Sequence, residues 1–221
     1  FIDAQRYHTA ISTTLNEWTP WQLKNLSAIV WLYRGETGKY HDLIEAYRGR
    51  AAKVASLFGG DAAEKLLGIG DVEDFAIAHE VMLAAIEAQK AAAKAEVDAL
   101  PKREQKKRRE ALAEVTARME SAATEIGEAV WLVEKFGEGE YADVPGLCKV
   151  AKRTEIQGDQ PAEKSSWSLT PGAYVGVPPV EDDGVDFHER MVEIHSELLE
   201  LQKRGNDLMA TIDRNFQELG L

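Results

Sequence analysis

The sequence has a single cysteine, fewer basic than acidic residues and no long apolar run. Cys148 has no cysteine partner in the chain, which excludes a small secreted fold held together by intrachain disulfides. No apolar run approaches the roughly 20 residues of a membrane-spanning helix, and we expect a cytoplasmic protein. The 26 lysines and arginines are outnumbered by 38 aspartates and glutamates, for a formal net charge of −12. Because phosphate contacts require clustered bases, any DNA contact is expected to be local or made by another subunit.

Motifs for catalysis, cofactors and metals are also missing. The glycines of Leu169–Gly176 lack the spacing and the following lysine of a phosphate-binding loop, so we interpret Pro171-Gly172 as a turn that places Tyr174 in a core. Cys148 has no partner motif for nucleophilic chemistry. No H-x-x-x-H or C-x-x-C pattern is present, and His79 is expected to be a polar packing residue. We therefore expect no catalytic, cofactor-binding or metal-binding residue. The histidines considered are His8, His41, His79, His188 and His195.

What the sequence does contain is helical periodicity. Thr19 followed by Pro20 predicts the start of a helix that ends at Gly35. A second helix is expected over 42–58. A third should begin with a capping-box-like pair, Asp61 and Glu64, and end near residue 67. The expected apolar stripe of the first helix is Leu23, Leu26, Val30 and Tyr33, widened by Ile29 and Trp31.

Residues 71–136 predict two long helices joined near Leu100-Pro101. Apolar positions alternate three and four apart, which is typical of an antiparallel hairpin with a heptad seam. The first arm becomes small and polar toward Pro101, so we expect firm packing at the base and loose packing at the tip. Each arm should be roughly 40 Å long and project from the body. The expected seam is Phe75, His79, Met82, Ile86, Gln89 and Ala93 on the first arm, and Leu112, Val115, Met119, Ala122, Ile126, Ala129, Val133 and Phe136 on the second.

The rest of the chain divides into an irregular segment and a last helix. Residues 137–179 are rich in glycine and proline, and predict a loop with one short extended segment around 174–177. Residues 186–219 predict a helix with one apolar stripe, weakened by Gly205. We call this stripe the terminal stripe. Leu199 and Met209 lie off this stripe and are expected to form a second apolar edge. The members of the terminal stripe are Phe187, Met191, Ile194, Leu198, Leu201, Leu208, Ile212 and Phe216. The expected fold is all-α: a helical bundle with a long projecting hairpin, a Gly/Pro-rich irregular segment and a long C-terminal helix.

Four short segments resemble the modification (M) subunits of type I restriction–modification systems, in the family's order. They are Phe1-Ile-Asp-Ala4, Tyr141-Ala-Asp-Val-Pro-Gly-Leu-Cys-Lys149, Ser168-Leu-Thr-Pro-Gly-Ala-Tyr-Val-Gly176 and Asn215-Phe-Gln-Glu-Leu-Gly-Leu221. The third is followed by an acidic stretch, as in the family. Ala173 stands where the family has arginine and Leu147 where it has phenylalanine, so any contact made by that arginine is absent.

The resemblance also suggests an insertion. The family is expected to carry once a short motif that occurs here in two versions, Gly35-Glu-Thr-Gly-Lys-Tyr-His-Asp42 and Gly137-Glu-Gly-Glu-Tyr-Ala-Asp143. We call this motif the glycine phrase. We expect four parts: an N-terminal helical segment over 1–42, a helical insertion over 43–136, the Gly/Pro-rich segment over 137–180, and an acidic linker with the last helix over 181–221. The beginning Phe1-Ile-Asp-Ala4 resembles the end of a strand that has lost its sheet, so we expect a fragment whose catalytic domain lies upstream.

In that family, the M subunit transfers a methyl group from S-adenosylmethionine to the N6 of adenine. No glycine-containing cofactor motif and no N-P-P-[FY] motif is present, so the resemblance implies a fragment without catalysis or cofactor. It implies a C-terminal module that docks the specificity subunit and orients the methyltransferase domain on DNA. The assembled complex would also contain a second M subunit and a restriction subunit, with no membrane.

Two surfaces keep alternative interpretations. The terminal stripe is either a seam for the specificity subunit or ordinary packing within this chain, and a self-associating helical homodimer is the second hypothesis for the whole fragment. The segment 102–109, which we call the basic segment, either contacts DNA phosphates in the complex or is a solvated tip. No aromatic residue is interleaved there, so stacking on bases is not expected. Its six bases are Lys102, Arg103, Lys106, Lys107, Arg108 and Arg109.

Overall fold

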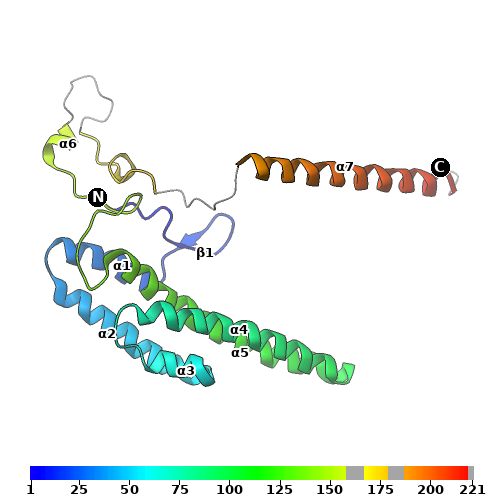
Figure 1. Ribbon diagram of the computed structural model, residues 1–221, viewed down its shortest axis with the longest axis horizontal. Helices are drawn as coiled ribbons and strands as arrows, with labels where there is room; N and C mark the ends of the chain where they lie inside the picture. Colours follow the sequence, from blue (N-terminus) through cyan, green and yellow to red (C-terminus); the bar gives the residue numbers. More distant parts are fainter. Residues whose placement is uncertain (158–166, 179–186, 219–221) are drawn as a thin grey trace. The chain divides into compact units, whose positions relative to one another are not determined.

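The computed structural model describes residues 1–157, 167–178 and 187–218, and the chain separates into two compact units, 1–178 and 179–221. The described residues confirm an all-α fold (Figure 1). Their strands are limited to a two-residue antiparallel pair, β1 (Thr9–Ala10) and β2 (Asn16–Glu17). In the described part of the chain, no helix combines the length and apolar character needed to cross a bilayer.

Helix α1 (Pro20–Tyr33) begins as predicted but buries a different face. Thr19 and Gln22 form a reciprocal capping box, and Gly35 follows the helix with a φ of +73°. The expected stripe is only partly confirmed: Leu23 is 49% and Tyr33 is 60% exposed, whereas Leu26 is half-buried against the core. The buried side chains are Gln22, Asn25, Ala28, Ile29 and Leu32.

The buried face of α1 includes two polar side chains, Gln22 and Asn25, and Asn25 is the centre of a hydrogen-bond network. Its side-chain amide donates to the Tyr7 hydroxyl and to the Glu128 backbone carbonyl, both at 2.8 Å, and accepts from the Tyr47 hydroxyl at 2.9 Å. Tyr7 also donates to the Glu128 carboxylate, which accepts from the Gln22 amide at 2.9 Å. Burial raises the pKa of both Tyr7 and Tyr47 well above the usual range, so both hydroxyls keep their protons. Four segments distant in sequence are thereby joined.

Helices α2 (Thr37–Val54) and α3 (Gly60–Leu67), separated by the 3-10 turn η1 (Ala55–Leu57), continue the core. Helix α2 starts five residues before the predicted start, so the first phrase lies partly within it. The capping box predicted at Asp61 is wrong: the N-cap is Gly59, without a side-chain cap, and Asp61 lies inside the first turn. The tandem glycines let the chain enter the helix earlier than the acidic pair suggested.

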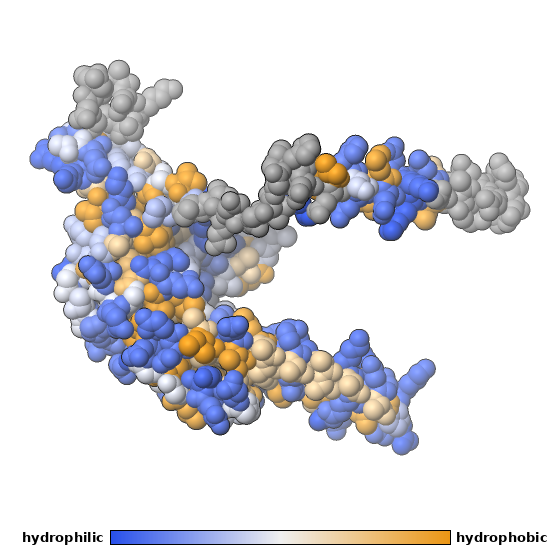
Figure 2. All heavy atoms as spheres, in the orientation of Figure 1, coloured by the Kyte–Doolittle hydropathy of each residue, from blue (hydrophilic) through white to orange (hydrophobic). Residues whose placement is uncertain are grey.

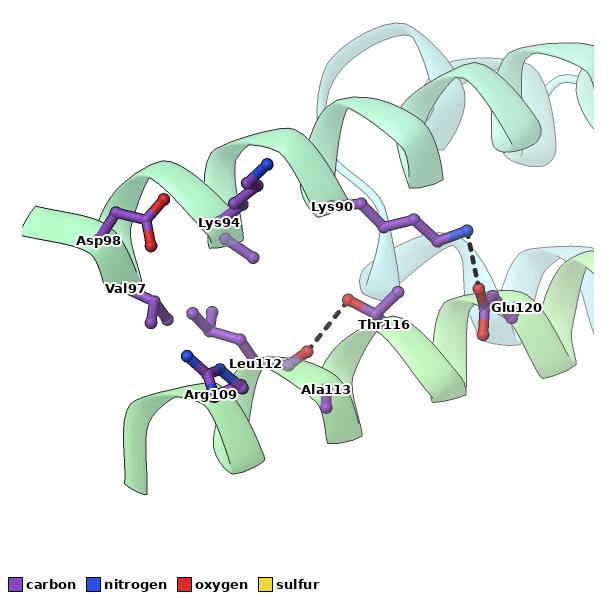
Figure 3. Close-up of a pocket in the computed structure, with 10 residues that line it drawn as sticks. Lys90, Lys94, Val97, Asp98, Arg109, Leu112, Ala113, Thr116 and Glu120 are labelled. Carbon is purple, nitrogen blue, oxygen red and sulfur yellow. Dashed lines mark hydrogen bonds and ion pairs between the residues drawn. The ribbon is translucent and has the colours of Figure 1, made fainter. Parts of the chain in front are cut away.

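Helices α4 (Asp74–Ala99) and α5 (Lys102–Phe136) form the predicted hairpin and lie side by side in Figure 1. Most predicted seam positions are buried, but Val115 is 40% exposed and Thr116 is buried in its place. The predicted positions on either side, Leu112 and Met119, are buried, so the difference is confined to one turn of α5. Near the tip Gln89 and Ala93 are only half-buried, and a cavity of about 500 Å³ lies between the arms (Figure 3). The predicted loose packing toward Pro101 is confirmed.

The Gly/Pro-rich segment is irregular as predicted, but its details differ. It contains a short helix α6 (Arg153–Gln157) that the sequence did not indicate, and a 3-10 turn η2 (Pro171–Ala173) at the turn predicted from Pro171-Gly172. The extended segment expected over 174–177 is wrong, because Tyr174 has helical φ and ψ of −112° and −40°. In the second unit, α7 (Phe187–Glu218) matches the predicted last helix, whose expected end at Leu219 lies outside the described residues.

The amide of Asn25 is expected to be essential for stability. In Asn25→Ala the buried Tyr47 hydroxyl and the Glu128 carbonyl lose their partner, which should lower the free energy of unfolding by about 3 kcal/mol. Urea unfolding measured by circular dichroism tests this. Ser27→Ala on the exposed side of the same helix is the control and should change stability by less than about 0.5 kcal/mol. Equal effects of the two substitutions would contradict a structural role for the network.

The stability of the hairpin should depend on pH through His79, which is half-buried against Gly127 of α5. Burial lowers the pKa of His79, although a hydrogen bond with the Ala123 backbone partly opposes the shift. The folded state therefore favours the neutral imidazole. Its contribution is complete above the unfolded pKa of about 6.5 and is lost as pH falls through the lower folded pKa.

Thermal unfolding midpoints should accordingly fall as pH is lowered from 7 toward 5, and His79→Gln should flatten this part of the profile. His195→Gln, which removes an exposed imidazole from α7, is the control and should leave the profile unchanged. A His79→Gln profile with the original slope would refute the assignment.

Candidate functional site

The terminal stripe lies on α7 and is solvent-exposed wherever its side chains are described. These side chains are Met191, Ile194, Leu198, Leu201 and Leu208, between 39% and 66% exposed. Phe187, Ile212 and Phe216 belong to the helix by backbone, and their side chains lie outside the described residues. Figure 2 shows orange side chains along α7 between blue ones. An exposed apolar stripe of this kind is typical of an interaction surface.

The stripe has a wider apolar margin than its heptad positions alone. Leu199 and Met209, which the sequence placed at its edge, are 54% and 59% exposed. Val192 is 58% exposed and adds to the same margin, although the sequence pattern did not single it out. The helix therefore presents apolar side chains over more than one row.

The basic segment forms the first two turns of α5, at the tip of the hairpin. Its six bases are exposed. Arg108 pairs with Glu96 of α4 at 2.6 Å, and Arg103 pairs with its neighbour Glu104 at 3.2 Å. The predicted position at the hairpin tip is therefore correct.

Three of the four family-like segments are brought together by the fold. Ile2 forms an antiparallel bridge with Cys148, the Asp3 amide donates to the Leu147 carbonyl at 2.7 Å, and the Lys149 amide donates to the Phe1 carbonyl at 3.0 Å. The sequence predicted that Phe1-Ile2 behaves as a strand end, and the backbone here forms a short extended pairing.

The third segment joins this pairing through backbone and ring contacts. The Gly146 amide donates to the Val175 carbonyl at 2.8 Å, and the rings of Phe1 and Tyr174 stack with centroids 4.2 Å apart. Tyr174 was expected in a core beyond a Pro171-Gly172 turn. The turn is present, but Tyr174 is only half-buried, and Val175 is the buried anchor. We call residues 1–4, 141–149 and 168–176 the three-segment cluster.

The two versions of the glycine phrase also contact each other. The Tyr40 hydroxyl donates to the Gly137 carbonyl at 2.6 Å, and the His41 ring lies 3.0 Å from the Glu138 carbonyl. Burial raises the pKa of Tyr40. Positions 40 and 137 are therefore adjacent in space, and the predicted insertion between them stays a prediction.

Comparison with known proteins gives one relative. The methylase subunit of the type I restriction enzyme HindI from Haemophilus influenzae is 38% identical over 80 residues. This similarity covers 36% of the chain and only 17% of that methylase subunit. The chain is thus related in part to a type I methylase subunit. No family model matches the chain, and no solved structure resembles it.

Neither reactive-group chemistry nor metal binding is indicated by the described residues. Cys148 is 1% exposed, and burial raises the pKa of its thiol, which disfavours the nucleophilic thiolate. In the described ranges, no three or more His, Cys, Asp or Glu side chains gather as a metal site would require. His188, a histidine considered at the sequence level, lies in α7 with its side chain outside the described residues.

A second hollow, missed by sequence reasoning, lies beside the three-segment cluster. It has a volume of about 550 Å³ and is lined by Asp3, His8, Glu17, Trp18 and Pro171, among others. Trp18 donates its indole N–H to the Tyr7 carbonyl at 2.6 Å and stays 48% exposed. No sequence motif could have indicated the hollow, because its lining comes from three separated segments.

The close packing of the three-segment cluster depends on glycine at position 146. Gly146 has a φ of +77°, and a β-carbon there would overlap the Pro178 ring. Gly176 has a similar φ of +74° but open space around its position. Gly146→Ala should therefore lower the free energy of unfolding by about 3 kcal/mol, and Gly176→Ala by about 1 kcal/mol.

Chemical denaturation of the two variants measures the difference in their free energies of unfolding, and limited proteolysis measures how well the Gly/Pro-rich segment is protected. Both substitutions strain a backbone with positive φ, so the additional loss of stability in Gly146→Ala measures the effect of the contact with Pro178. Equal losses in stability and protection would show that this contact does not hold the cluster together.

Proposed function

We propose that this chain is the C-terminal subunit-docking module of a type I restriction–modification M subunit, and that α7 binds the specificity subunit. The observation that carries the proposal is the exposed terminal stripe on a 32-residue helix. The partial similarity to the HindI methylase subunit supports the family. The parent protein would be a site-specific DNA N6-adenine methyltransferase that uses S-adenosylmethionine, with its catalytic domain outside this chain.

The energetics favour a partner for α7. Full burial of one leucine-sized side chain contributes about 1.5–3 kcal/mol, so the five described stripe residues represent a large gain that solvent exposure leaves unused. At 1.5 Å per residue, the helix is about 48 Å long, enough to form a seam with one or two partner helices. A module of this kind would hold the specificity subunit and orient the methyltransferase domain on DNA, while a second M subunit and the restriction subunit complete the complex.

The decisive test is a charge substitution in the stripe. Leu198→Glu combined with Leu201→Glu should reduce binding to the specificity subunit at least 100-fold, because two carboxylates would be desolvated in an apolar seam. Ser196→Glu, at an exposed position on the opposite side of the helix, is the control and should change affinity less than about threefold. Binding is measured by isothermal titration calorimetry with the purified subunit. Intact binding by the double variant would refute the assignment of α7.

A homodimer formed through the same stripe is the second candidate function. The exposed stripe on α7 would be equally satisfied by a second copy of the helix. Light scattering on a sizing column distinguishes the two: the docking module is a monomer that shifts into a complex with the specificity subunit. A chain that is already dimeric and ignores that subunit favours self-association.

A further inference from the structure

The bases at the hairpin tip are divided between two sides of α5. Lys102, Lys106 and Arg109 are spaced i, i+4 and i+7, which places them on one helix face. Arg109 and Ala113, the next position of this face, line the cavity between the arms, together with Lys94 of α4. Figure 3 shows Lys94 and Arg109 projecting from the two facing helices beside this cavity. We call Lys94, Lys102, Lys106 and Arg109 the basic edge.

Pairing separates this edge from most other bases of the tip, and Lys107, which also has no ion pair among the described residues, lies with Arg103 on another side of α5. Arg108 is engaged by Glu96, Arg103 by Glu104, and Lys90 by Glu87 and Glu120 at 2.8 and 3.0 Å. Among the described residues, no member of the basic edge takes part in an ion pair. Asp98 also lines the cavity, and Glu120 is already occupied by Lys90. The edge therefore keeps four cations that carry positive charge toward solvent.

The surrounding sequence makes this charge local. Residues 94–109 contain seven bases and three acids, whereas the whole chain has a formal net charge of −12. A compact positive edge on an acidic protein attracts a polyanion to one place only, because the rest of the surface repels it. Lys102 to Arg109 spans about 10 Å along the helix axis, and a DNA duplex has one phosphate for about every 1.7 Å of its axis.

The chemistry of the edge favours duplex DNA over single strands. From residue 76 to residue 130 the sequence has no phenylalanine, tyrosine or tryptophan, so the hairpin tip offers none of these rings on which an unpaired base could stack. The one amide side chain in the basic segment, Gln105, donates to the Leu100 carbonyl at 2.9 Å. The side-chain amide that could read a base edge is thus occupied, while the exposed lysines and arginine of the basic edge are free to contact phosphates, which receive most protein–DNA hydrogen bonds.

We propose that the basic edge binds the phosphate backbone of duplex DNA without reading its sequence. The inference goes beyond subunit docking and is independent of it, because no residue of α7 contributes. It predicts binding that is weak, insensitive to sequence and strongly dependent on salt, since each phosphate contact releases counterions.

The test uses the full 221-residue chain, a fluorescent duplex of mixed sequence and two matched triple variants. Lys102→Gln, Lys106→Gln and Arg109→Gln together remove three charges of the edge. Arg103→Gln, Lys107→Gln and Arg108→Gln together remove three charges from the same eight residues on the other side. By fluorescence anisotropy at low salt, the first variant should lose at least about tenfold in affinity and reduce the slope of log K against log salt by about 3. The second should lose less than about threefold.

Three outcomes would overturn the proposal. Equal losses in both variants would indicate diffuse attraction to the tip instead of binding at the edge. Tighter binding of oligo(dT), or competition by poly-glutamate as effective as by duplex DNA at equal charge, would assign the edge to single strands or to acidic proteins. Absence of duplex binding by the unmodified chain at 50 mM salt would leave no function for the edge on DNA. Circular dichroism of each variant confirms that the exposed substitutions leave the fold intact.

Discussion

The structure of the first unit depends on one buried amide. Asn25 joins the segment before α1, through Tyr7, to α2 through Tyr47 and to α5 through the Glu128 carbonyl. Tyr7 continues the connection by stacking on Trp131 with ring centroids 3.8 Å apart. A buried amide without these partners would cost several kcal/mol, so the three elements can pack only in the arrangement that satisfies it. Apolar contacts alone do not specify how these helices are positioned against one another, and the network selects one relative position.

This network also constrains how the expected insertion relates to its flanks. Residues 43–136 supply Tyr47 and Glu128, whereas Tyr7 and Asn25 come from before them, and one apolar core contains buried residues from position 28 to position 148. The adjacent glycine phrases at 40 and 137 would allow such a segment to enter and leave the fold at one point. The hairpin is therefore structurally continuous with the body.

The sequence predicted the helices well and the packing face of α1 poorly. Capping residues and three-four spacing are local signals, which explains the success with α1, the hairpin and α7. The choice of face on α1 is a tertiary property: Leu23 and Tyr33 look like core residues until Asn25 finds its partners on α2 and α5. The three-segment cluster could be anticipated only as three separate motifs, because its backbone pairing joins positions more than 140 residues apart. The basic edge could be defined only from the structure, because the sequence shows six bases but not which of them pair with Glu96 and Glu104.

The two proposed surfaces differ in the physics that would govern them. The terminal stripe gains free energy by removing apolar area from water, a term that ionic strength hardly changes. The basic edge gains it by releasing counterions from phosphates, a term that falls steeply with salt. A complex that relies on both would stay assembled while its nonspecific hold on DNA is adjusted by ionic conditions. Weak contact with the DNA phosphate backbone also suits a protein whose DNA-sequence specificity is expected from another subunit. A hairpin that itself read bases would compete with that recognition.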